Sequence, residues 1–387
     1  MDFSLRRIAS HYLLTQQGWR VRPLITIKVY EDLSHEILSI EEYSPTSLDS
    51  QAGVEFYDGI LCAGFINIHS HLELAYLRGA IAEGEGFAAF ADSMARVRNN
   101  FSEQEQLSAI AKADEEMWQE GVDAVGDIVN GSTSFATKAT SRILYHNFAE
   151  VFGLRRCNLE EQKRLLQEPN TTLTPHSTYS VTDAAFKEVC NTTSQSPLSI
   201  HFLETEDEAL LYNGQGRLHE WYSQVGFECD FLDYGSPAKR IVATIPPQRS
   251  VILVHNTVLT PSDVEMLSDH FTAPLYWVLC PRSNEYISRQ KPQSVELLRA
   301  GAKNICIGTD SLASNRSLSM VEELKMFRNI PLAEMLTWAT LNGAKALGID
   351  DDFGTIEVGK KSGIVNISGV DLSNLTLTPN SHAKRIL

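Results

Sequence analysis

Short apolar runs alternate with amphipathic stretches through the middle of the chain. The runs have strand length and are rich in Val, Ile and Leu, as is typical of strands buried in a parallel sheet. They lie at 61–68, 122–127, 143–152, 251–255, 275–280 and 305–310. With two shorter runs that end at His176 and His201, they give about eight strands. This alternation predicts an α/β protein.

Capping signals mark where some of the intervening helices begin. Ser102 and Glu105 have the spacing of a capping box, and the helix that they open is expected to end near Gly121. The segment Thr260–Asp263 offers an N-cap residue, a proline at the first helical position and an acid in the first turn. One further helix is expected from Pro331 to about Leu347.

Both ends of the chain have β character. Strand-length pieces occur at 10–15, 24–30, 35–40, 354–356, 363–367 and 384–387. We therefore expect one small sheet domain from residues 1–60 plus 354–387, and a (β/α)8 barrel from 61–353. A doubly wound open sheet is the alternative, because it shows similar alternation. No Gly-x-Gly-x-x-Gly or phosphate loop follows a strand, which disfavours that alternative.

Polar residues able to bind metal stand where the apolar runs end. His69 and His71 close the first run, and residues i and i+2 of a strand point to the same face, so both imidazoles can reach one ion. Later runs end in His176, His201-x-x-Glu204, His255 and Asp310. In a parallel barrel the carboxyl ends of the strands share one face, where active sites lie. These side chains are therefore candidates for one site.

Four of these residues form a ligand set for a catalytic metal. His69, His71 and His201 offer nitrogens and Asp310 offers a carboxylate oxygen. Such a set suits one divalent ion, Zn2+ first and Fe2+ or Mn2+ as alternatives, with a position left for water. The ion would lower the pKa of that water from 15.7 toward about 7. Asp310 could bind the ion and also accept the proton of the water.

The remaining strand-end residues have two readings each. Glu204 could shuttle a proton from water to the substrate, or it could be one more surface acid beside Glu206 and Glu208. His255 could orient the attacking water or stabilise a developing oxyanion, or it could be bonded to Asn256 or a backbone carbonyl. His176 could contact the substrate or be structural.

The ordered motifs resemble the amidohydrolase superfamily, in particular its mononuclear deaminase and chlorohydrolase-like branch. The resemblance rests on His69-x-His71, His201-x-x-Glu204, His255 and Asp310, and on three local segments. These segments are 64–74 with 77–79, Thr174–Ser180, and the Pro-x-Ser-Asn loop at Pro281–Asn284. It covers nearly the whole chain and implies a β-sandwich formed by both termini. One departure is the closing segment 354–364, which lacks the family's Ala-Asp pair.

The resemblance also implies roles for particular residues. His69, His71, His201 and Asp310 would hold one metal, and Glu204, His255 and Asp310 would serve catalysis. Glu73 and Arg78 would contact substrate, with a surface ion pair as the alternative. Three other residues are of interest: Glu150 is expected to be a polar pocket residue rather than a ligand, Asn284 to hold backbone, and Ser314 or Asn315 to orient Asp310.

The resemblance implies hydrolytic deamination of an amino-substituted N-heterocycle, with a purine-like substrate of the adenosine or aminodeoxyfutalosine type. Two other leaving groups would suit the same metal-bound hydroxide: a chloride, or the nitrogen of a cyclic amide such as an imidazolone. A non-catalytic scaffold is disfavoured because every ligand position is filled.

Composition restricts the partners. The 33 basic and 49 acidic residues give a net charge of −16, which disfavours nucleic acid and anionic membrane surfaces. The six cysteines form no Cys-x-x-Cys pair, and the first residues lack a hydrophobic signal core. We therefore expect a cytoplasmic enzyme with a small-molecule substrate. A homodimer is the common state of soluble enzymes and is the default expectation.

Overall fold

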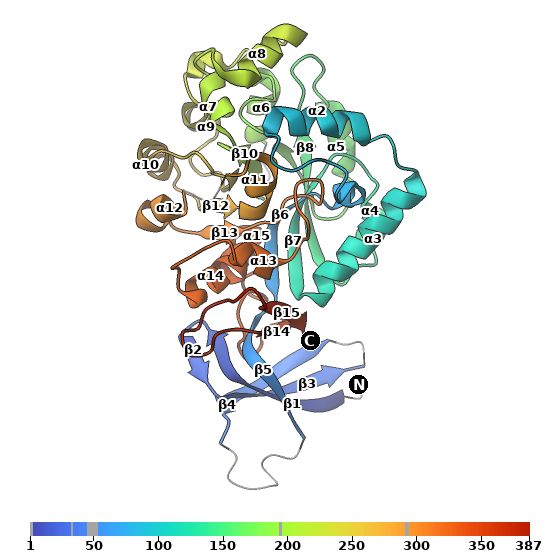
Figure 1. Cartoon of the computed structure of the whole chain (residues 1–387), viewed down its shortest axis with the longest axis vertical. Helices are drawn as coiled ribbons and strands as arrows, with labels where there is room; N and C mark the ends of the chain where they lie inside the picture. The colour runs from blue at the N-terminus through green and yellow to red at the C-terminus, as the bar shows by residue number, and fades with distance from the viewer. Residues whose placement is uncertain (1–2, 32–33, 45–52, 193–195, 291–293) are drawn as a thin grey trace. The chain divides into compact units, whose positions relative to one another are not determined.

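The computed structural model describes residues 3–31, 34–44, 53–192, 196–290 and 294–387 (Figure 1). The chain divides into two compact units. One unit comprises Met1–Asn67, Glu115–Ala124 and Ser319–Leu387, and the other comprises Ile68–Asp114 and Val125–Leu318. Among the described residues, no helix has both the length and the apolar character needed to cross a membrane.

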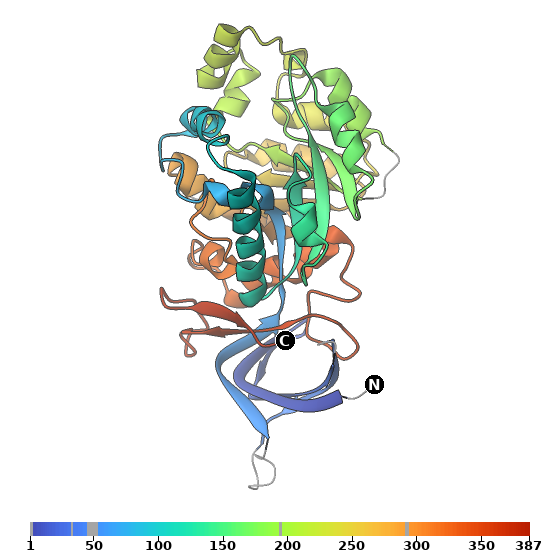
Figure 2. The ribbon, with the colours of Figure 1, turned by 90° about the vertical axis from the view of Figure 1, so that its right-hand side faces the viewer.

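The first unit contains a seven-stranded sheet with the order β15-β14-β5-β1-β3-β4, in which β2 also pairs with β1. Figure 2 shows how strongly these strands curve. Inward-facing residues of alternating strand positions, such as Ile25 and Ile27, fill its core. The strands are β1 (Phe3–Thr15), β2 (Gly18–Val21), β3 (Pro23–Tyr30), β4 (His35–Glu42), β5 (Val54–Ala63), β14 (Ile364–Ser368) and β15 (His382–Arg385).

Chain segments from both ends therefore share one sheet, joined where β14 pairs antiparallel with β5. The strands expected at 10–15, 24–30, 35–40 and 363–367 are confirmed. The strand expected at 354–356 is wrong, since that segment is irregular, and the last strand lies at His382–Arg385 instead of 384–387. Gly354 explains the first error: its φ is +88°, which a strand does not adopt.

Eight further strands form two four-stranded sheets, with the orders β6-β7-β8-β9 and β10-β11-β12-β13. The second sheet is parallel throughout, and β8 is parallel to β9. Parallel bridges join Ser177 to His201 and Ser70 to Asp310, which connects the edge of each sheet to the other. The strands are β6 (Phe65–Ser70), β7 (Val122–Val129), β8 (Leu144–Val151), β9 (Thr171–Pro175), β10 (Leu198–Phe202), β11 (Val251–His255), β12 (Leu275–Leu279) and β13 (Ile305–Ile307).

Helices connect these strands and cover them (Figure 1). The expected capping box of Ser102 and Glu105 is confirmed at the start of α3. The expected N-cap residue Thr260 is confirmed at the start of α10, where Thr260 and Asp263 also form a capping box. The helices are η1 (Leu72–Leu77), α2 (Phe87–Val97), α3 (Glu103–Gln119), α4 (Phe135–Lys138), α5 (Leu159–Leu165), α6 (Asp183–Cys190), α7 (Glu206–Leu211), α8 (Gly216–Val225), η2 (Leu232–Tyr234), α9 (Pro237–Thr244), α10 (Pro261–His270), α11 (Pro281–Ser288), α12 (Val295–Gly301), α13 (Met320–Leu324), α14 (Leu332–Ala339) and α15 (Leu341–Leu347).

The helix expected after Pro331 is in fact two helices. α14 ends at Ala339 and α15 begins at Leu341, because Thr340 has φ −131° and ψ −88°, outside the helical region. The predicted end is confirmed, since Gly348 caps α15 in the left-handed conformation with φ +67°.

The apolar run 61–68 is not one strand, as the sequence suggested, but parts of two. β5 ends at Ala63, β6 begins at Phe65, and Gly64 separates them. Gly64 donates its N–H to the carbonyl of Gly363 at 2.9 Å, and a Cβ on Gly64 would lie 2.1 Å from an oxygen of Asp123. Only glycine leaves room for that carboxylate. Periodicity alone could not show this break, because the residues on both sides of Gly64 are apolar.

Asp123 links three segments of the first unit that are far apart in sequence. Its Oδ2 accepts the N–H of Gly363 at 2.8 Å, and its Oδ1 accepts from the guanidinium of Arg385 at 2.7 Å. Both side chains of this ion pair are buried, and the guanidinium also stacks on Trp118 at 3.6 Å from the ring centre. The pair thus ties β15 and the start of β14 to the start of β7.

We expect Asp123→Ala to lower the free energy of unfolding by about 3–5 kcal/mol, because it leaves a buried guanidinium without its partner. Urea unfolding followed by circular dichroism would measure this. Asp352→Ala is the matched control, since the Asp352–Lys361 pair is exposed and should contribute less than about 1 kcal/mol. Equal losses in the two variants would contradict the anchoring role of Asp123.

Candidate metal centre at the strand ends

Three histidines converge at the carboxyl ends of β6 and β10. The Nε2 atom of His71 lies 3.2 Å from Nε2 of His69 and 3.3 Å from Nε2 of His201. All three residues are buried, and their nitrogens satisfy the distance criterion for a shared ion. Asp310, which follows β13, completes the cluster, with its Oδ1 atom 3.4 Å from Nε2 of His71 and 3.8 Å from that of His69.

These spacings fit a bound cation. Nitrogens placed tetrahedrally around Zn2+ at about 2.0–2.1 Å are separated by about 3.3 Å, which matches the separations found here. Burial and the neighbouring imidazoles hold the pKa values of His69 and His201 well below the ordinary value, so both rings are neutral. Neutral imidazole is the form that binds metal.

The hydrogen bonds of His201 select the nitrogen that it presents to the cluster. Its Nδ1 atom lies 3.0 Å from the backbone carbonyl of His176, so this nitrogen carries the proton and donates it. Nε2 then holds the free lone pair and faces His71. A partner on the outer nitrogen fixes tautomer and ring orientation in this way at many metal sites.

Asp310 is held as an oriented carboxylate. Burial alone would raise its pKa, but His71, His255 and His69 and a hydrogen bond from Ser283 together hold the pKa below the ordinary value. Its Oδ2 atom accepts from the hydroxyls of Ser283 at 2.5 Å and Ser314 at 2.9 Å. The expected role of Ser314 is therefore confirmed, whereas Asn315 donates to the carbonyl of Thr309 instead.

Glu204 and His255 form a second pair beside the histidine cluster. Nε2 of His255 lies 3.9 Å from Oε1 of Glu204, and its ring centre lies 5.7 Å from that of His69. Glu204 is only 8% exposed, so it is not a surface acid, and burial raises its pKa. Nδ1 of His255 lies 3.0 Å from Oδ1 of Asn284.

That contact corrects one expectation and bears on one alternative. Asn284 was expected to hold backbone, whereas its side chain orients the ring of His255. The alternative bond of His255 to Asn256 does not form, since the amide of Asn256 donates to the carbonyls of Leu253 and Val278. Among the described residues, Nε2 of His255 has no hydrogen-bond partner, so this buried nitrogen is presented to Glu204.

His176 and Glu150 flank His201. The ring of His176 stacks on that of His201 with centres 4.6 Å apart, and its Nδ1 atom lies 2.6 Å from the hydroxyl of Ser180. Glu150 is buried, with Oε1 3.5 Å from Nδ1 of His201 and Oε2 accepting from Asn130. These three residues also satisfy the distance criterion for a metal group, the second found in the described part of the chain.

The two remaining predicted residues lie on the segment that follows β6. Glu73 accepts the backbone N–H groups of Asn130 at 3.1 Å and Gly131 at 3.2 Å, and burial raises its pKa to about 7. Arg78 is exposed at the end of η1. Glu73 thus contacts the backbone of Asn130 and Gly131, and Arg78 lies at the surface.

Sequence reasoning missed Ser283 and Glu208. Ser283 stands in the Pro-x-Ser-Asn loop whose asparagine was noted, so the motif itself carried the signal. Glu208 was treated only as part of an acidic run. It accepts from the hydroxyl of Thr178 at 2.5 Å and from the backbone N–H of Glu204 at 3.2 Å, and burial raises its pKa to about 8. Sequence spacing could not distinguish it from exposed Glu206.

Backbone strain gathers around the site. Leu203, His255, Asn256 and Asp310 all have positive φ, between +47° and +77°. Residues other than glycine adopt this conformation at a cost of order 1–3 kcal/mol, and such residues cluster at functional sites. Here the N–H groups of Asn256 and Asp310 donate to carbonyls of neighbouring strands, at 3.0 and 2.9 Å, which holds the strained ends in place.

We compared the chain with known protein families and with individual relatives. A sequence model of the amidohydrolase family matches residues 60–383. A 5-methylthioadenosine/S-adenosylhomocysteine deaminase of Thermoanaerobacter pseudethanolicus is 26% identical over 350 residues, covering 80% of this chain and 73% of the relative.

Two solved structures are similar in fold. The aminofutalosine deaminase of Helicobacter pylori in complex with methylthio-coformycin has a TM-score of 0.79 at 23% identity, covering 99% of this chain and 100% of its own. An adenosine deaminase from Xanthomonas campestris with bound zinc has a TM-score of 0.71 at 22% identity, covering 96% and 86%. The family match and these neighbours imply an α/β TIM-barrel fold.

We expect single substitutions His69→Ala, His71→Ala and His201→Ala each to lower Zn2+ affinity by tenfold or more, because each removes one nitrogen of the cluster. Competition with a chromophoric chelator would measure the affinity. His219→Ala, on α8 and outside the cluster, is the control and should bind like the unmodified protein. Unchanged affinity in the three cluster variants would refute the site.

Glu208 should make stability depend on pH. Its folded pKa of about 8 exceeds the ordinary value of 4.5, so the folded state binds the proton more tightly. The contribution of protonated Glu208 to the free energy of unfolding is complete below about pH 4.5 and is lost as pH rises toward 8. The unmodified chain should therefore lose of order a few kcal/mol of unfolding free energy between pH 5 and 8. We expect Glu208→Gln not to show this loss, because glutamine does not titrate. Urea unfolding at both pH values tests this, with exposed Glu206→Gln as the control that retains it.

Proposed function

The chain belongs to the amidohydrolase family, and we propose that it is a metal-dependent hydrolase that removes an amino group from a nucleoside-like N-heterocycle and releases ammonia. The observation that carries this proposal is the buried convergence of His69, His71, His201 and Asp310 beside the Glu204–His255 pair. The names of the relatives support it, since those compared above are deaminases of adenosine-type compounds.

We propose one divalent ion held by His69, His71, His201 and Asp310. Zn2+ is favoured by the three nitrogens and one carboxylate, by the separations of these atoms, and by the zinc bound to the Xanthomonas campestris neighbour. When bound, the ion supplies a Lewis acid that makes water acidic enough to lose a proton near neutral pH.

We assign the proton transfers to Asp310 and Glu204, assisted by His255. Asp310 stays ionised at neutral pH because its pKa is low, so its Oδ1 atom can accept a proton from water. Glu204 has a raised pKa and so holds a proton more readily, which suits it to deliver one to a ring nitrogen of the substrate. His255, oriented by Asn284, presents Nε2 toward Glu204 and the developing negative charge.

Substrate contacts are proposed for Glu73, Arg78 and His176. Glu73, with a pKa of about 7, can donate as a carboxylic acid or accept as a carboxylate, which suits recognition of ring or ribose polar groups. His176 is neutral near pH 7, because burial lowers its pKa to about 3, and it lies directly against the metal-facing His201.

We also propose that the two four-stranded sheets close into one eight-stranded barrel within residues 61–353. The bridges Ser177–His201 and Ser70–Asp310, one at each seam, support closure. Residues 1–60 with 354–387 are proposed as a separate β-sandwich domain, supported by the sheet that both termini share. None of the described cysteines is in a disulfide, which supports the expected cytoplasmic location.

Glu204→Gln tests the proposed reaction. We expect ammonia release from adenosine or 5-methylthioadenosine to fall by 10² or more, because the amide cannot transfer the proton, while Zn2+ content is unchanged. A coupled ammonia assay and metal analysis measure the two effects. Glu206→Gln is the control. Retained turnover in Glu204→Gln would remove the proton-transfer role. If no purine releases ammonia, while a chlorinated heterocycle releases chloride or a cyclic amide gives a ring-opened product, the alternative leaving groups would be favoured.

A further inference from the structure

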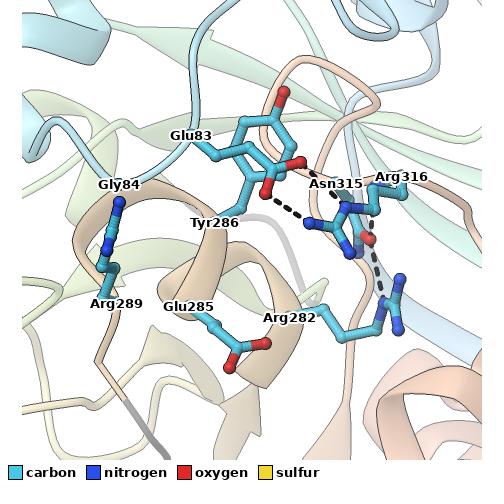
Figure 3. Close-up of a pocket in the computed structure, with 8 residues that line it drawn as sticks. All are labelled: Glu83, Gly84, Arg282, Glu285, Tyr286, Arg289, Asn315 and Arg316. Carbon is cyan, nitrogen blue, oxygen red and sulfur yellow. Dashed lines mark hydrogen bonds and ion pairs between the residues drawn. The ribbon is translucent and has the colours of Figure 1, made fainter.

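A charged cavity of about 310 Å³ lies beside helix α11 (Figure 3). The helix presents Arg282, Tyr286 and Arg289 to this cavity, at the spacing i, i+4 and i+7 that places residues on one helix face. It presents Ser283 and Asn284 to the metal centre. One face of α11 is therefore directed to the cavity and another to the proposed active site.

The ion pair in that cavity is exposed, whereas another ion pair of the same unit is buried. Glu83 and Arg316, joined in Figure 3, are 42% and 69% exposed. Asp127 and Lys138 are 0% and 5% exposed, and Oδ2 of Asp127 lies 2.5 Å from Nζ of Lys138. Burying two charges costs so much solvation that an apolar pair of similar volume is often equally or more stable. Stability alone therefore does not account for the buried pair.

Asp127 binds the backbone directly after a proposed metal ligand. It lies near the end of β7, which is the neighbour of β6 in the sheet. Its Oδ1 atom accepts the N–H of Leu72 at 2.8 Å, and this N–H belongs to the peptide group that joins His71 to Leu72. Because a peptide group is planar, its orientation sets the ψ angle of His71, which is 76°. Asp127 thus fixes the backbone from which the imidazole of His71 extends.

A second carboxyl group makes the reciprocal contact. Glu73, the residue after Leu72, accepts the N–H groups of Asn130 and Gly131, which directly follow β7. Each of the two strand ends therefore supplies a carboxyl group to the backbone of the other. A shift of one strand end past the other would break the contact of Asp127 and the contact of Glu73 together.

Lys138 holds the second oxygen of Asp127. Its ammonium group also donates to Oδ1 of Asn147 at 2.7 Å, and it lies 5.1 Å from the ring centres of Phe135 and Tyr145. These contacts leave the buried ammonium few alternative positions. A hydrogen bond to an ionised carboxylate is roughly twice as strong as one between neutral groups. The pair is thus suited to a backbone contact that has to keep its geometry.

We propose that Asp127, held by Lys138, is a positioning residue for the metal ligand His71. Its carboxylate fixes the peptide group after His71, and through that group the direction in which the imidazole points. The inference rests on the proposed function, because it takes His71 as a ligand of the divalent ion. Neither Asp127 nor Lys138 is among the ligands, proton-transfer residues or substrate contacts proposed above.

Two double variants separate the contact with Leu72 from the ion pair. Asp127→Asn with Lys138→Met and Asp127→Leu with Lys138→Met both remove the ion pair, but only the first keeps an oxygen that can accept the N–H of Leu72. We expect the leucine variant to bind Zn2+ about tenfold or more weakly, as is typical when a group that orients a metal ligand is lost. The asparagine variant should bind like the unmodified chain. Competition with a chromophoric chelator measures the affinities.

Co2+ in place of Zn2+ gives a readout that a loss of stability does not change. The visible absorption of protein-bound Co2+ depends on the arrangement of its ligands, so it shifts if the imidazole of His71 is displaced. We expect a shifted spectrum in the leucine variant and an unshifted one in the asparagine variant, with thermal unfolding showing that both are folded. Equal affinities and spectra in the two double variants would overturn the positioning role, whether both match the unmodified chain or both differ from it.

Asp127→Glu decides the question if the leucine variant does not fold. This variant keeps the charge and the partner Lys138, but its side chain is longer by one methylene group. The carboxylate then cannot keep its present place at both Leu72 and Lys138, so we expect weaker Zn2+ binding and a shifted Co2+ spectrum. Unmodified affinity together with an unshifted spectrum in Asp127→Glu would overturn the inference.

Metal binding and turnover distinguish a failure of this inference from a failure of the proposed function. If the unmodified chain binds Zn2+ but releases no ammonia from adenosine or 5-methylthioadenosine, the proposed reaction fails, and the affinities and spectra still decide the role of Asp127. If ammonia is released and the two double variants behave alike, the reaction stands and the positioning role fails. If the unmodified chain binds no Zn2+, both fail.

Discussion

Two backbone hydrogen bonds carry the geometry of the candidate centre. The N–H groups of Thr309 and Asp310 both donate to the carbonyl of His69, at 3.0 and 2.9 Å. They fasten the end of β13 to the end of β6, so Asp310 and His69, two of the proposed ligands, share one backbone junction. A shift of either strand would separate Asp310 from His71. The rest of the site is arranged around this junction.

Fixing the strand ends at that junction costs backbone strain, and in return the side chains are already placed for an ion. The Nε2 atom of His71 lies 3.2 and 3.3 Å from those of His69 and His201, separations that fit coordination, and the strand ends around them adopt strained backbone angles. Strain of this kind persists only where the surrounding structure over-determines it. The outer contacts of His201, Asp310 and His255 do so here, and they leave little reorganisation to be completed when an ion binds.

The sequence predicted the site better than it predicted the fold's boundaries. His-x-His spacing and polar strand ends are consequences of strand periodicity, so His69, His71, His201 and Asp310 could be grouped without coordinates. The break at Gly64 could not be predicted, because it depends on the carboxylate of the distant Asp123. The break at Thr340 could not be predicted either, because it lies in the backbone angles of that one residue. The sequence also did not show which acidic residues are buried, so buried Glu208 could not be distinguished from exposed Glu206.

Helix α11 has a consequence for how this chain can vary. Successive helical residues are rotated by about 100°, since 3.6 residues make one turn. A single insertion or deletion between Pro281 and Arg289 would therefore rotate everything beyond it away from its present neighbours, and Tyr286 and Arg289 would no longer share a face with Arg282. A substitution in this helix changes the contacts of one face only. A change in its length would disturb the contacts of both faces, the one with Ser283 and Asn284 and the one with Tyr286 and Arg289.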